Sequence, residues 1–160
     1  MPASQSLLIA DSYSAKKDLT TLTVLPYGNI DIPGQWMKTN YVASSGQHFF
    51  KNVDSTIIAV GKFPQTKAPS YLKSYTDYEN AYAFYKWDTD FFSNEQDFQI
   101  SEIRMDEINC YILFNMNNEK FNSTFIFGLK NGFIYNLSVQ TGNWPVEKKH
   151  SFLINLFKDN

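Results

Sequence analysis

The clearest pattern in the sequence is an alternation of apolar and less apolar positions between Ile108 and Gln140. Three runs place apolar side chains at every second position, with Ser123 as the one small exception: Ile108, Cys110, Ile112, Phe114 and Met116; Phe121, Phe125, Phe127 and Leu129; Phe133, Tyr135, Leu137 and Val139. Successive side chains on a strand point to opposite faces, so this period predicts three antiparallel strands, each with one buried and one solvated face. Asn131-Gly132 suits a type I′ turn and predicts a tight hairpin between the last two.

Two segments have the features of helices. Thr76-Asp77-Tyr78-Glu79 has the hydroxyl and carboxylate spacing of a capping box, and the apolar residues after it recur at intervals of three and four. We therefore predict a helix over Asp77–Ser93 with a broad apolar face. A second helix is predicted from about Pro145 to the C-terminus, because proline is tolerated in the first turn.

The order of these elements predicts the fold class. Further strand patterns cover Asp18–Pro26, Tyr41–Asn52 and Ser55–Phe63. Strands, helix, strands, helix is typical of an α+β fold, here an antiparallel sheet of about six or more strands with both helices packed against it. Residues 1–17 are polar and Ser-rich, and we expect a flexible N-terminal arm there, followed by a single α+β domain at residues 18–160.

Composition narrows the class of protein. Hydrophobic residues make up 43% and charged residues 19% of the chain, which excludes a disordered protein. The net charge is −2 and no basic run exceeds two residues, so no nucleic-acid partner is expected. No apolar run is long enough for a membrane span. Cys110 is the only cysteine; we expect a cytoplasmic location, or a periplasmic one if a signal peptide has been removed.

Residues with catalytic or metal-binding chemistry are sparse. His48 and His150 are the only histidines, and neither has a second ligand at a suitable spacing, so no metal and no cofactor are expected. Ser44 and His48 lie on one predicted strand, too far apart for direct contact. Carboxylates on the predicted helix, Asp88 among them, are interpreted as a solvated face, and Cys110 as a small buried hydrophobe.

One stretch resembles a known family. Asn29 to Trp36 has a short strand leading into Ile32-Pro33-Gly34-Gln35-Trp36. With the order of elements over Thr20 to Asp159, it resembles the PsbP-like superfamily, which includes the extrinsic protein of the oxygen-evolving complex, a small Ran-binding protein and uncharacterised bacterial proteins. The resemblance implies an antiparallel sheet sandwiched by helices and a non-enzymatic binding role. It transfers no ligand residue.

These observations favour a non-enzymatic binding or protein–protein interaction module, with a protein partner expected at an exposed aromatic patch. We place that patch near Trp36 and Tyr41, with Gln47 and His48 as further candidates for the interaction surface. One alternative is a carrier that holds a small apolar ligand between the sheet and the Asp77–Ser93 helix. Another is a hydrolase with a dispersed site. An apolar cavity of about 300 Å³ or more would favour the carrier.

Overall fold

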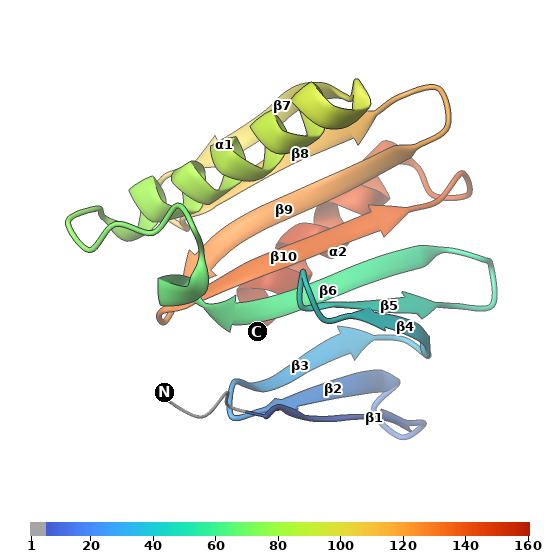
Figure 1. The fold of residues 1–160 in the computed structure, drawn as a ribbon. Coiled ribbons are helices and arrows are strands. Elements are labelled where there is room, and N and C mark those ends of the chain that lie inside the picture. The colour runs from blue at the N-terminus through green and yellow to red at the C-terminus, as the bar shows by residue number, and fades with distance from the viewer. Residues whose placement is uncertain (1–5) are drawn as a thin grey trace.

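The computed structural model describes residues 6–160 and contains two antiparallel sheets and two long helices (Figure 1). The larger sheet has the order β4-β5-β6-β10-β9-β8-β7 and the smaller one β1-β2-β3. The strands are β1 Leu8–Ser14, β2 Leu19–Leu25, β3 Gly28–Pro33, β4 Met37–Val42, β5 Gln47–Lys51, β6 Ile57–Pro64, β7 Gln99–Asp106, β8 Tyr111–Asn117, β9 Asn122–Lys130 and β10 Phe133–Gln140. The helices are η1 Gln65–Lys67, α1 Asp77–Gln96 and α2 Val146–Asp159. The predicted α+β fold is confirmed.

The predicted hairpin lies in the middle of the larger sheet. Asn131 and Gly132 have φ angles of 54° and 82°, the positive values that a type I′ turn requires, and β9 and β10 pair from Lys130 and Phe133 onward. On its other side β10 pairs with β6. This single pairing joins the strands that precede α1 to those that follow it, so residues distant in sequence form one continuous surface.

Each face of the larger sheet packs against a different helix. α1 lies over β7, β8 and β9, whereas α2 lies over β9 and β10 on the opposite face (Figure 1). The prediction of one solvated face is therefore wrong for β8 and β9, because Tyr111, Leu113 and Ile126 are buried beneath α2. Cys110 is also not on a strand. It lies in the turn before β8 with a φ of 58°, and it is only partly buried.

Part of the segment that we expected to be a flexible N-terminal arm is a strand of the smaller sheet. Leu8–Ser14 forms β1 and pairs with β2 along its whole length, while residues 1–5 lie outside the described residues. The sequence indicated no more than a short strand or turn within this arm, because β1 is an edge strand with mostly exposed residues and carries no strong alternation. Leu22 and Ile30 of β2 and β3 pack with Leu153 of α2, and thus extend the core on that side.

The segment Tyr41–Asn52, predicted as one strand, is a hairpin. A turn at residues 43–46 separates β4 from β5, and the amide of Gly46 donates to the carbonyl of Val42 over 2.8 Å. Gly46 has a φ of 67°, a left-handed conformation that glycine adopts without strain. This turn folds against β6, where it borders the groove described below.

The start of α1 provides a direct test of local stability. The amide of Glu79 donates to Oγ1 of Thr76 over 3.2 Å, and the amide of Thr76 donates to Oε2 of Glu79 over 2.7 Å. We expect Thr76→Ala to lower the free energy of unfolding by about 1 kcal/mol, because one of these bonds is lost. Urea denaturation measures the change. Thr66→Ala, in the exposed η1 turn, is the control; an equal loss in both variants would contradict the role of the cap.

Candidate functional site

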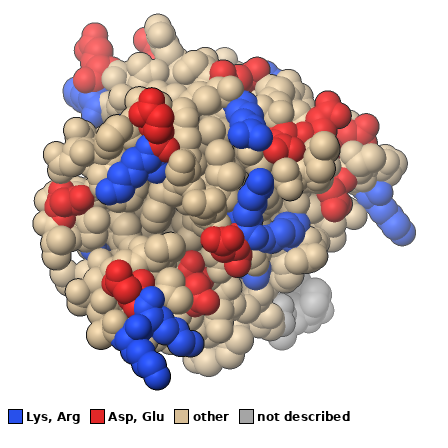
Figure 2. Space-filling model, turned by 180° about the vertical axis from the view of Figure 1, so that it is seen from behind, with Lys and Arg blue, Asp and Glu red and all other residues tan. Residues whose placement is uncertain are grey.

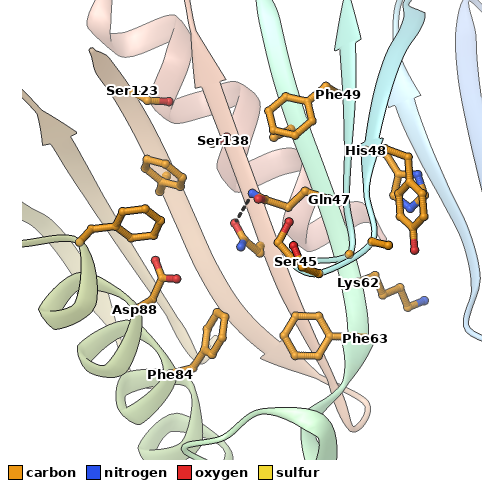
Figure 3. A pocket seen from close by; sticks show the side chains of 18 of the residues that line it. Ser45, Gln47, His48, Phe49, Lys62, Phe63, Phe84, Asp88, Ser123 and Ser138 are labelled. Atoms are coloured by element: carbon orange, nitrogen blue, oxygen red, sulfur yellow. Dashed lines mark hydrogen bonds between the residues drawn. The ribbon is translucent and has the colours of Figure 1, made fainter. Parts of the chain in front are cut away.

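A groove with a volume of about 900 Å³ lies beside α1 on the face of the larger sheet that this helix covers only in part. α1 covers β7 to β9, and no helix of the described chain covers β10, β6 and β5 on the same face (Figure 1). The groove therefore has a wall of helix, a floor of sheet and a second wall made by the β4–β5 turn. Figure 3 shows side chains from all three elements around the same space.

The helical wall is aromatic. Residues three and four apart share a face of a helix, so Phe84, Asp88 and Phe92 point toward the sheet while Trp87 and Phe91 form the upper part of the wall. Trp87 stacks on Phe84 with ring centroids 6.0 Å apart, and Phe91 lies edge-on to Phe92 at 5.3 Å. Trp87 and Phe91 are 46% and 53% exposed, so the chain itself covers these large apolar rings only in part.

The middle of the floor is formed by small and polar side chains, and Phe49 and Phe63 line the sheet beside them. Strand alternation turns Asn136 and Ser138 of β10 toward the groove, while Leu137 between them points toward α2. Nε2 of Gln47 donates to Oδ1 of Asn136 over 3.5 Å, a bond drawn in Figure 3. Ala59 of β6 adds a further small side chain. Each of Ala59, Asn136 and Ser138 is less than a tenth exposed, and none of them fills the space above the sheet as a large apolar side chain would.

Among residues 6–160, Asp88 is the only acidic residue that lines the groove. Figure 3 shows its carboxylate directed from α1 into the space over the sheet. Burial raises the pKa of Asp88 from 3.8 to about 6. Within residues 6–160 the side chain makes no hydrogen bond and no ion pair. By contrast Asp90, on the outer side of the same helix, pairs with Lys86 at 3.2 Å.

Basic residues lie at the opposite end, where the groove continues around the β4–β5 turn. Nζ of Lys67 donates to the hydroxyl of Tyr27 over 2.6 Å. Nζ of Lys62 lies 4.7 Å from the centre of the Phe133 ring, and burial lowers the pKa of Lys62. Both ammonium groups are thus already in contact with aromatic side chains of the protein.

Two of the four predicted surface residues are buried. Trp36 is 6% exposed; its indole N–H donates to the carbonyl of Pro33 over 2.7 Å, and its ring packs against Trp144 and Phe152. The aromatic patch cannot include it, so that placement is wrong. The ring is buried because β3, β4 and α2 meet there. His48 is 2% exposed, so it too is not a surface residue.

Tyr41, Gln47 and His48 nevertheless come together at the groove, and Trp36 does not. Tyr41 and His48 are stacked with ring centroids 4.5 Å apart. The pKa of His48 is lowered to about 4, first by burial and then by the charge of Lys38, so its imidazole is neutral at pH 7. Tyr41 and Gln47 remain partly exposed at the border of the groove.

Asp88 was not among the residues expected at a binding site, because we interpreted the carboxylates of this helix as a solvated face. A signal was present: Asp88 follows Phe84 by four residues, and Phe92 follows Asp88 by four, so the carboxylate interrupts an apolar row. Across residues 6–160 there is no cluster of three or more His, Cys, Asp or Glu arranged to hold a metal ion. None of the helices in this range is long and apolar enough to cross a membrane.

The face turned away from the groove offers a contrast. Figure 2 shows acidic and basic side chains interspersed there, with no extended surface of one charge among the described residues. The groove differs from this face because its lining is mainly aromatic and contains few charged residues.

The chain shares its fold, an antiparallel sheet packed between helices on its two faces, with a solved PsbP structure. The solution structure of cyanobacterial PsbP (CyanoP) from Synechocystis sp. PCC 6803 is similar, with a TM-score of 0.52 and 14% sequence identity. The match covers 99% of this chain and 94% of that one. At this identity the likeness shows the fold alone, as the resemblance in sequence implied. No family profile and no curated protein matches the chain.

Proposed function

We propose that this protein is a non-enzymatic binding module that holds a small, largely apolar ligand between α1 and the sheet. The groove of about 900 Å³ carries the proposal, because pockets for small molecules span roughly 300–1,000 Å³ and are lined mainly by apolar side chains. The size and lining support a carrier, the alternative raised from the sequence. A PsbP-like fold supports a binding role.

Burial of the exposed aromatic rings of α1 would favour ligand binding. Covering apolar surface contributes roughly 25 cal/mol for each Å² removed from water, so a ligand that covers Trp87 and Phe91 gains affinity without any rearrangement of the core. Asn136 and Ser138 on the floor then orient the polar part of the ligand. Tyr41 and Gln47 are proposed contacts at the border, for this ligand or for a protein partner. A cytoplasmic location remains part of the proposal.

Titration with Nile red, an uncharged dye that fluoresces in apolar sites, tests this function. We expect saturable binding, and we expect Ser138→Leu to weaken it by about tenfold, because the larger side chain occupies space that the dye would fill; a tenfold loss of affinity corresponds to about 1.4 kcal/mol. Ser101→Leu makes the same change on the exposed strand β7, outside the groove, and should leave binding unaltered. Absence of dye binding, or an equal effect of both substitutions, would refute the proposal.

A further inference from the structure

We propose that the ligand of the groove is an amphiphilic organic cation, an ammonium group attached to an apolar chain or ring, and that Asp88 is its counter-charge. This inference rests on the proposed function and specifies the class of ligand. It follows from three features of the groove: an unpaired carboxylate, the aromatic rings around it, and the engagement of the basic residues at the other end.

The position of Asp88 is the first feature. It lies between Phe84 and Phe92 in the row of α1 residues that faces the sheet, and the facing floor residues Ser123, Asn136 and Ser138 carry no charge. Within the described chain no basic side chain pairs with Asp88. A carboxylate in such surroundings is costly unless a positive charge lies nearby. A bound cation supplies that charge.

The aromatic wall is the second feature. Ammonium groups are attracted to the faces of aromatic rings, most strongly to tryptophan, and cages of aromatic residues are a recurring solution for binding quaternary ammonium. Trp87 and Phe91 flank Asp88 in sequence and line the same groove. Because both rings are about half exposed, the part of each ring that the protein leaves uncovered is available to a ligand, unlike the packed rings of the core.

The charge balance of the lining is the third feature. The other titratable groups around the groove are Tyr27, Tyr41, His48, Lys62 and Lys67. Lys67 contacts the Tyr27 hydroxyl and Lys62 the Phe133 ring, at the end of the groove away from α1. Neither lysine contributes to the pKa shift of Asp88, which has burial as its cause, and His48 is neutral at pH 7. The local charge at the α1 end of the groove is therefore negative.

Displacement of Nile red by three probes of equal chain length tests the inference: decyltrimethylammonium and decanoate, each below its critical micelle concentration, and 1-decanol below its solubility limit. We expect the cation to bind at least about tenfold more tightly than the alcohol and the acid at neutral pH. Asp88→Asn should reduce affinity for the cation by about tenfold or more and leave that for the alcohol within about twofold. Asp88→Glu keeps the charge and should retain the preference.

Asp90→Asn is the matched control, because it removes the same charge from the outer side of α1, and it should change nothing. Acidification gives a second readout on the unmodified chain: affinity for the cation should fall below about pH 6, where Asp88 takes up a proton, while affinity for the alcohol stays constant. Equal or tighter binding of decanol or decanoate would overturn the inference and leave the proposed function intact. If no probe displaces the dye and the dye itself does not bind, the proposed function fails.

Discussion

Gly128→Ala is expected to lower the free energy of unfolding by about 3 kcal/mol, although it adds a single methyl group. The new Cβ would lie 2.5 Å from Cε2 and 2.6 Å from Cζ of Phe157 on α2, well inside any normal contact. Phe157 is 1% exposed and packs edge-on against Tyr111 and Tyr135, at centroid distances of 5.8 and 5.4 Å. The ring therefore has no space into which it can move, and helix and sheet must separate.

Urea denaturation of both forms measures this loss. Gly142→Ala is the matched control, because no atom lies within 4 Å of its added Cβ, and its stability should change by less than about 0.5 kcal/mol. Phe157→Leu removes the clashing ring atoms, so in a double-mutant cycle the two substitutions together should be less harmful than the sum of their separate effects. A loss of stability that is the same in the Phe157→Leu background would show that the close approach is not the cause.

The sequence predicted those parts of the fold that depend on local chemistry. The hairpin at Asn131-Gly132 and the start of α1 at Thr76 each depend on a few neighbouring residues with defined backbone preferences, and both formed as expected. Alternation in β8 and β9 also identified strands. The alternation could not show that a helix packs on each face of these strands. Large apolar side chains alternate there with smaller apolar ones, and this pattern resembles the alternation of buried and solvent-exposed residues.

The groove could not be predicted from the sequence because its parts meet only in the folded chain. Asp88, Ser138 and Gln47 come from a helix, a central strand and a hairpin that are widely separated in sequence. The turn at residues 43–46, which forms one wall, was itself read as part of a strand. Trp36 failed as a surface candidate for a related reason: its burial depends on α2, which lies more than a hundred residues further along the chain.

Asp88→Asn should stabilise the ligand-free protein at about pH 7.5 by about 2 kcal/mol. The pKa of Asp88 is raised from 3.8 to about 6 in the folded state, so the folded chain binds this proton more tightly than the unfolded chain. Such a group opposes folding once it is ionised. The penalty is absent below about pH 4 and complete above about pH 6. This rise in pKa corresponds to at most about 3 kcal/mol, and residual contact with water lowers the figure.

Urea denaturation of the unmodified chain and Asp88→Asn at about pH 7.5 and about pH 4 tests this directly, since the gain should disappear at the lower pH. Asp90→Asn, which removes an exposed charge paired with Lys86, should change stability by less than about 1 kcal/mol. A loss of stability in Asp88→Asn at neutral pH would mean that the carboxylate already has a favourable partner in the free protein. A gain of stability in Asp88→Asn, together with weaker binding of cations, would show that Asp88 lowers the stability of the free protein and strengthens ligand binding. Residues of binding sites commonly have both effects.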